Sequence, residues 1–97
     1  MSQSAPASLQ LKVITSTRLL VEEEVKEVTL PSVEGCLGIL PGHCPLLVAI
    51  GEGELSYKSA GKTGEFSIAG GYAEILPERV LVFTEIHQND KNKIDKR

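Results

Sequence analysis

The sequence contains no tryptophan, and aromatic residues make up only 4% of its 97 residues. A hydrophobic core in this chain must therefore be filled by branched aliphatic side chains. No run of about 18 apolar residues is present, so we expect no membrane-spanning segment. The N-terminus lacks the basic and apolar blocks of a secretory signal, and we expect residues 1–8 to be a disordered lead-in. The length suits one domain rather than two.

Basic residues are scarce outside the C-terminal end. Residues 1–89 hold six lysine and arginine residues against eleven glutamates, a net charge of −5, whereas residues 90–97 hold four of the ten basic residues. An acidic body repels phosphate backbones, so we expect no nucleic-acid partner. We interpret the run Glu22–Glu24 as a solvated turn or edge, and the alternative is an acidic patch that contacts a basic partner.

Apolar and polar residues alternate with a period of two through most of the chain, for example in Leu9–Ile14 and Leu55–Lys58. This pattern is typical of half-buried antiparallel strands. Val80–Phe83 is apolar on both faces, which predicts a central strand. Turn signals recur about every ten residues, and the pair Gly70-Gly71 indicates a bulge or tight corner. The pattern predicts a single all-β domain, a sandwich or flattened barrel, with little or no helix.

Both cysteines fall within residues 35–46, which read GCLGILPGHCPL. Cys36, His43 and Cys44 offer three ligands, but structural zinc needs four, usually in two close pairs, so we expect no metal. Thiol catalysis needs a base, an orienting group and an oxyanion hole, and no helix start is predicted beside either cysteine. We therefore expect two small, semi-buried cysteines, with no catalytic group and no cofactor.

A possible phosphate-binding loop is also rejected. The triplet Gly61-Lys62-Thr63 resembles the end of a Walker motif, but Ser56 stands where the motif needs its first glycine. The residues that follow continue as a strand rather than a helix. We expect residues 59–64 to be the tip of a hairpin, in which glycine accepts a positive φ.

The segment Glu34–Leu47, EGCLGILPGHCPLL, resembles the signature of the epsilon subunit of the F-type rotary ATP synthase. Three later segments resemble, in the same order, a turn that ends in glycine, an apolar strand with a Gly-Gly pair, and the closing strand of that family. These segments are Ile50–Gly53, Phe66–Ile75 and Val80–Thr84. The resemblance covers residues 9–88, which we expect to form the epsilon-type domain.

The resemblance implies a flattened ten-stranded β-sandwich that has no catalytic role of its own. It implies a rotor subunit in the central stalk, which grips the gamma subunit, sits on the membrane c-ring and helps couple ion-driven rotation to ATP synthesis. The expected location is the cytoplasmic face of a bacterial inner membrane, with the chloroplast thylakoid as the alternative. The alternative function is a generic all-β protein-binding module that uses the loop 35–46.

The resemblance also implies a set of interface residues. The loop from Glu34 to His43 is expected to face the c-ring and the foot of gamma, and His43 to act mainly as a hydrogen-bonder that holds the loop. Cys36 occupies a commonly acidic position near the ring, so a salt bridge from that position is in doubt. The expected gamma and c-ring interface comprises Thr15, Glu34, Cys36, Leu40, Pro41, His43 and Val48.

The C-terminal segment 89–97 is expected to be a tail or the start of a missing helical hairpin. Full-length members of the family carry such a hairpin, and some bind ATP there. Ile94–Arg97 resembles the first half of that ATP-binding motif. Since the motif is incomplete, we expect neither an ATP site nor inhibition by hairpin extension. A fragment and a naturally short subunit remain alternative explanations.

Overall fold

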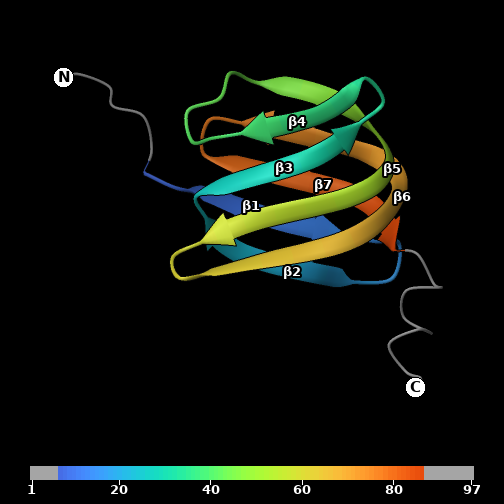
Figure 1. The fold of residues 1–97 in the computed structure, drawn as a ribbon, viewed down its shortest axis with the longest axis horizontal. Helices are drawn as coiled ribbons and strands as arrows, with labels where there is room; N and C mark the ends of the chain where they lie inside the picture. Colours follow the sequence, from blue (N-terminus) through green and yellow to red (C-terminus); the bar gives the residue numbers. More distant parts are fainter. Residues whose placement is uncertain (1–6, 87–97) are drawn as a thin grey trace.

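Residues 7–86 are described by the computed structural model, with Ile86 described by its backbone alone. They form seven strands and no helix, which confirms the all-β prediction (Figure 1). The strands are β1 (Leu9–Ile14), β2 (Leu19–Val25), β3 (Glu27–Ser32), β4 (Gly35–Ile39), β5 (Leu46–Ser59), β6 (Lys62–Leu76) and β7 (Arg79–Ile86). Their order in the sheet is β2-β1-β7-β6-β5-β3-β4. All neighbouring strands are antiparallel except β1 and β7, which run parallel.

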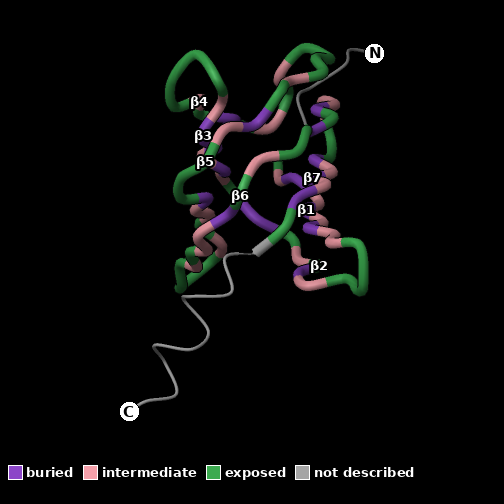
Figure 2. The backbone as a smooth tube through the Cα atoms, turned by 90° about the vertical axis from the view of Figure 1, so that its right-hand side faces the viewer, coloured by how far each residue is buried: buried purple, intermediate pink, exposed green. Residues whose placement is uncertain are grey.

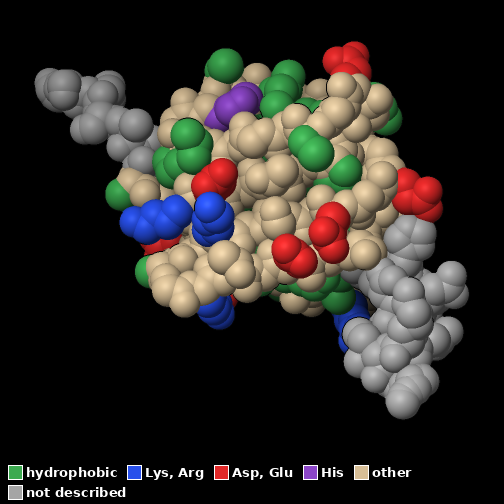
Figure 3. All heavy atoms as spheres, viewed as in Figure 1, with side chains coloured by type: hydrophobic (Ala, Val, Ile, Leu, Met, Phe, Trp, Pro, Cys, Tyr) green, Lys and Arg blue, Asp and Glu red, His purple; other side chains and the backbone are tan. Residues whose placement is uncertain are grey.

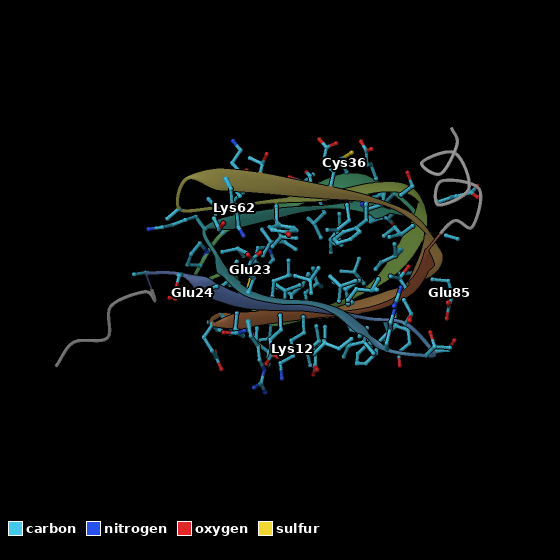
Figure 4. The ribbon with its side chains drawn as sticks, turned by 90° about the horizontal axis from the view of Figure 1, so that it is seen from below. Lys12, Glu23, Glu24, Cys36, Lys62 and Glu85 are labelled. Atoms are coloured by element: carbon cyan, nitrogen blue, oxygen red, sulfur yellow. The ribbon has the colours of Figure 1, made fainter. Side chains whose placement is uncertain are left out.

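The sheet folds over on itself because its two longest strands bend. β5 has 14 residues and β6 has 15, and both pass from one layer to the other (Figure 4). Their segments 46–50 and 71–76 continue the layer of β2, β1 and β7. Their segments 52–59 and 62–69 continue the layer of β3 and β4. The result is a two-layered β-sandwich that is closed along the side where β5 and β6 bend.

The described residues form seven strands rather than the expected ten. Two of the expected turns are bends inside the continuous strands β5 and β6, which accounts for two of the three missing strands. At the first, the β3–β5 register slips between Thr29 and Ser32, so that extra residues of β5 bulge out near Gly51. At the second, the β6–β7 register slips between Ile68 and Gly71. Gly70 and Gly71 have φ values of 93° and 125°, which other residues rarely adopt. The predicted Gly70-Gly71 bulge is thereby confirmed.

Aliphatic side chains alone make up the buried hydrophobic core of the described residues. Figure 2 shows, in purple, that the buried residues lie on strands of both layers. The prediction of a core without aromatic residues is therefore confirmed for the described residues. β7 lies between β1 and β6, which confirms its predicted central position. The core residues are Leu9, Leu11, Val13, Val21, Val25, Val28, Leu30, Ile39, Ile50, Leu55, Ile68, Ala73, Ile75, Val80 and Val82.

A polar contact joins the two layers at the end opposite the bends. Glu23 of β2 lies 2.6 Å from Lys62 at the start of β6, and the two reach toward each other from opposite layers (Figure 4). The bond from Lys62 lowers the pKa of Glu23, and the same bond raises the pKa of Lys62. Burial, followed by the Glu23 charge, raises the pKa of Tyr57, whose ring lies against Gly64. Within the acidic run 22–24, Glu23 is therefore half-buried and points between the layers, whereas Glu22 and Glu24 are exposed.

Candidate docking surface

One outer face of the sandwich carries apolar side chains in register across four strands. The ladder pairs Ile14 with Phe83, Phe83 with Tyr72 and Tyr72 with Ala49. The adjacent row pairs Leu47 with Glu74, Glu74 with Leu81 and Leu81 with Lys12, and it ends at the Lys12–Glu22 ion pair on the edge of the surface. Directly paired residues present their side chains on the same face, so these residues form one surface. We call it the apolar outer face, and it comprises Ile14, Leu47, Ala49, Tyr72, Leu81 and Phe83.

Several members of the apolar outer face are well exposed to solvent. Leu47 is 68% exposed and Tyr72 is 51% exposed. The rings of Tyr72 and Phe83 are tilted against each other, with centroids 5.1 Å apart. Contiguous apolar surface that remains in contact with water is a recognised mark of a protein–protein or membrane contact. Sequence reasoning missed these residues, although an aromatic residue at the outward position of a strand is a signal it could have used.

An open depression of about 350 Å³ extends the apolar outer face toward the bends. It is lined by Tyr72 and Phe83, by the backbone of the Gly70-Gly71 bulge, and by the segments 14–16 and 84–85. Thr15 stands at its edge and accepts hydrogen bonds at Oγ1 from the N–H groups of Thr17 and Arg18. These bonds hold the turn after β1 in place. Thr15 is thus the one predicted interface residue that adjoins the apolar outer face.

The opposite outer face, formed by β3, β4 and the second layer's parts of β5 and β6, is polar. Its cross-strand row runs from Gly38 through Thr29 and Ser56 to Glu65. Figure 3 shows this side of the molecule, on which charged side chains are scattered and hydrophobic side chains are sparse at the centre. The contrast between the two outer faces indicates that one of them is suited to water and the other to a protein surface.

The predicted loop 35–46 is partly a strand. Gly35–Ile39 pairs with β3 as β4, and Leu40–Pro45 forms the connection to β5. Within that connection the N–H of His43 donates to the carbonyl oxygen of Leu40 at 3.1 Å. Nδ1 of His43 lies 2.8 Å from the carbonyl oxygen of Cys44, to which it donates in the matching tautomer. The Gly42 N–H also donates to the Pro77 carbonyl oxygen, which ties the connection to the β6–β7 turn.

The predicted interface residues fall into three groups: Glu34 with Cys36, Leu40 with Pro41 and His43, and Thr15 with Val48. Glu34 lies in the turn between β3 and β4, whereas Leu40, Pro41 and His43 lie beyond the far end of β4. Five residues of extended strand separate these two places by roughly 16 Å, at about 3.3 Å per residue. Leu40 is exposed and Pro41 and His43 are half-buried. The structure therefore does not bring Glu34 together with the connection that contains His43.

Val48 occupies a different row from the exposed residues that flank it. The ladder pairs Val48 with Ala73, Ala73 with Val82 and Val82 with Val13, and those three partners are fully buried. Val48 itself is half-buried and packs against the core. Its neighbours Leu47 and Ala49 face outward instead. Val48 would therefore act on an interface indirectly, because it anchors the strand that carries the exposed residues Leu47 and Ala49.

Both cysteines are free and exposed, so the expectation of semi-buried cysteines is wrong. The cause for Cys36 is the alternation of β4, in which Leu37 and Ile39 face inward and Cys36 faces outward (Figure 4). Within residues 7–86, no group of three or more histidine, cysteine or acidic side chains could hold a metal ion. That part of the chain also contains no helix of the length and apolarity needed to cross a membrane.

The fold and its surfaces define a small all-β sandwich with one apolar and one polar outer face. Comparison with known sequences then identifies its family. The beta-sandwich domain of the ATP synthase delta/epsilon chain matches residues 8–89. The chain therefore belongs to this family, which confirms the resemblance to the epsilon subunit of the F-type ATP synthase.

Individual relatives agree with the family assignment. The chain is 43% identical over 81 residues to the "ATP synthase epsilon chain" of Solibacter usitatus, covering 84% of this chain and 60% of that protein. It is 44% identical over 77 residues to the protein of the same name from Herpetosiphon aurantiacus, covering 79% of this chain and 57% of that protein. The chain thus spans about 60% of the length of these curated relatives.

Solved structures of ATP synthases contain the same fold. A chain of the Euglena gracilis mitochondrial ATP synthase, solved as OSCP/F1/c-ring, superposes with a TM-score of 0.79 at 25% identity, covering 97% of this chain and 65% of that one. A chain of the Tetrahymena thermophila mitochondrial ATP synthase central stalk and c-ring gives a TM-score of 0.69 at 13% identity, covering 84% and 66%. At that lower identity the likeness supports the fold alone.

Proposed function

We propose that the chain is a non-catalytic central-stalk subunit of an F-type ATP synthase. In this role it binds the gamma subunit and the membrane c-ring, and it helps couple ion-driven rotation to ATP synthesis. The single observation that carries the proposal is the apolar outer face, because a family member with this surface exposed requires a protein partner to cover it. The bacterial relatives support a position at the cytoplasmic face of a bacterial inner membrane.

The apolar outer face is the proposed docking surface for gamma. Stable protein interfaces bury about 1,200 Å² or more in total and place apolar and aromatic residues at their centre. Tyr72, Phe83 and Leu47 provide such a centre on rigid strands, so little conformational entropy is lost on binding. Thr15 lies at the edge of the same surface, as a gamma contact should.

A binding experiment with paired variants tests this assignment. Leu47→Glu introduces a charge into the apolar outer face, and Ser56→Glu introduces the same charge into the polar outer face. Isothermal titration with the gamma subunit from the same genome should show at least tenfold weaker binding for Leu47→Glu, and unchanged binding for Ser56→Glu. If the wild-type chain does not bind gamma, the proposed function is wrong. If a folded Leu47→Glu variant binds normally, the docking surface is wrong.

The β3–β4 turn and the connection that contains His43 are proposed to contact partners in addition to the apolar outer face. Because they lie at opposite ends of β4, we assign them to two separate contacts. We assign Glu34 and Cys36 to the c-ring side, and Leu40, Pro41 and His43 to the foot of gamma. The exposed thiols of Cys36 and Cys44 offer natural attachment points for a thiol-to-amine cross-linker in the assembled synthase.

The cross-linking result has a clear expectation. Cys44, which follows His43, should join to gamma, and Cys36 should join to a c subunit. A Cys36→Ser variant should lose the c-subunit product and retain the gamma product, and a Cys44→Ser variant should do the reverse. Identical products from both single variants would contradict the division into two contacts.

A further inference from the structure

The depression at the bends combines an aromatic wall with a floor that has no side chains. Tyr72 and Phe83 form the wall, and the two rings are inclined at 31° to each other. Gly70 and Gly71 form the floor, where a Cβ on Gly71 would collide with the carbonyl group of Phe83. The glycine at position 71 lets β7 pack closely against β6, and the bulge contributes no side chain of its own to the depression, so a partner side chain that enters it can lie against the rings.

A single carboxylate stands at the edge of this depression. Glu85 lines it, and its Oε2 accepts a hydrogen bond from the N–H of Ser16 at 3.1 Å. This bond orients the carboxylate and leaves Oε1 available to a partner. No lysine or arginine in residues 7–86 forms an ion pair with Glu85 or lines the depression. Figure 4 shows Glu85 at the bent end of the sandwich, far from the Glu23–Lys62 pair.

We propose that this depression receives an arginine side chain of the gamma subunit when gamma docks on the apolar outer face. The inference rests on the proposed function, and it names the chemistry of one anchor within that interface. A guanidinium is planar, stacks on aromatic rings, and forms forked bonds to a carboxylate. The Tyr72–Phe83 wall and the Glu85 carboxylate present both of these partners side by side. A lysine would pair with Glu85 as a point charge but would gain less from the rings.

The test compares neutral variants of two exposed acids on opposite outer faces of the molecule. Glu85→Gln keeps an oxygen that accepts the Ser16 N–H, so the turn after β1 is preserved. Glu65→Gln is the matched control, because Glu65 is exposed and belongs to the polar outer face. Binding to gamma is measured by isothermal titration at low and at high salt, and thermal unfolding confirms that each variant is folded.

We expect Glu85→Gln to weaken binding about tenfold at low salt, equivalent to about 1.4 kcal/mol, with a smaller loss at high salt. Glu65→Gln should bind as the wild type does. Tyr72→Leu retains an apolar side chain but removes the ring, and we expect about fivefold weaker binding from the lost stacking. Replacing individual arginines of gamma should identify one whose loss is not additive with Glu85→Gln.

Three results would overturn the proposal. If Glu85→Gln binds as tightly as the wild type at both salt concentrations, the arginine anchor is wrong while gamma docking survives. If the wild type fails to bind gamma, both proposals fall. If Glu85→Gln and a chain ending at Asn89 lower the Tm of the isolated protein equally, without changing gamma binding, then the chain's own basic segment occupies the depression.

Discussion

The carboxylate of Glu23 lies 2.6 Å from the ammonium group of Lys62, and this pair joins β2 of one layer to β6 of the other. The bends of β5 and β6 connect the layers at one end of the sandwich. At the other end this pair adds to the β2–β3 connection at Lys26, whose N–H donates to the Lys58 carbonyl oxygen. We expect Glu23→Gln and Lys62→Met to lower the Tm. Glu27→Gln should have a smaller effect, because Glu27 and Lys58 lie 3.9 Å apart on adjacent strands of one layer. A larger Tm loss for Glu27→Gln would contradict the role of the Glu23–Lys62 pair.

The pH dependence of stability follows from the same pair. The pKa of Glu23 is lowered by the Lys62 bond, so its stabilisation is present above the unfolded value near 4.3 and is lost as the pH falls through the folded value. The pKa of Lys62 is raised by the Glu23 bond, so its stabilisation is present below the unfolded value near 10.4 and is lost as the pH rises through the folded value. The Tm difference between wild type and Glu23→Gln should therefore be largest between these limits and should shrink in acid.

Gly71 should tolerate no side chain. Its φ is 125°, and an added Cβ would meet the Phe83 carbonyl of the neighbouring strand. Gly71→Ala should lower the free energy of unfolding by more than about 2 kcal/mol, through backbone strain and displacement of β7. Gly38→Ala is the control, because an added Cβ there meets nothing within 4 Å. Denaturant unfolding measures both changes, and equal effects would show that the bulge is more adaptable than its geometry implies.

The hydroxyl of Thr84 should stabilise the bulge of β6. Thr84 is 5% exposed, and its Oγ1 donates to the carbonyl oxygen of Gly70. Thr84→Val keeps the shape but removes the donor, and we expect a loss of about 1–3 kcal/mol in unfolding free energy. Thr84→Ser keeps the donor and should retain most of that contribution. If serine and valine destabilise equally, the lost methyl contacts rather than the hydrogen bond determine the effect.

The two cysteines should be chemically accessible and structurally dispensable. Cys36 and Cys44 are both exposed. In the native isolated chain, a colourimetric thiol reagent should titrate two thiols per chain without denaturant. The double variant Cys36→Ser, Cys44→Ser should unfold within about 0.5 kcal/mol of the wild type, as surface substitutions usually do. A thiol that reacts only after unfolding would show that its loop is more closed than described.

Local sequence patterns predicted those features of the fold that depend on neighbouring residues. The period-two alternation predicted strands, the apolar run Val80–Phe83 predicted a central strand, and the Gly70-Gly71 pair predicted a bulge. The number of strands could not be obtained in this way, because a glycine-rich bend and a true turn have the same local signal. The same ambiguity hid β4, whose two glycines made Gly35–Ile39 resemble a loop.

The outward aromatic residues of single strands could have been noted in the sequence, but their assembly into one apolar outer face depends on register between distant strands. Ile14 and Phe83 lie on the same row only because β1 and β7 pair in parallel, and Tyr72 joins them through β6. Neither pairing is visible in the alternation of a single strand. The family resemblance pointed to Thr15 and Val48, and these residues adjoin or underlie the surface on which Leu47 and Tyr72 are exposed. The predictions for residues 1–6 and 87–97, including the motif at Ile94–Arg97, fall outside the described residues.

The parallel pairing of β1 with β7 has a consequence for how the chain acquires its fold. The β5–β6 hairpin joins residues close in sequence, so it can form early, whereas the β1–β7 ladder must close a loop of nearly the whole domain. During synthesis β1 leaves the ribosome long before β7, and until β7 emerges β1 is paired with β2 on one side only. We therefore expect completion of the domain to be a late, slow step that waits for the last strand.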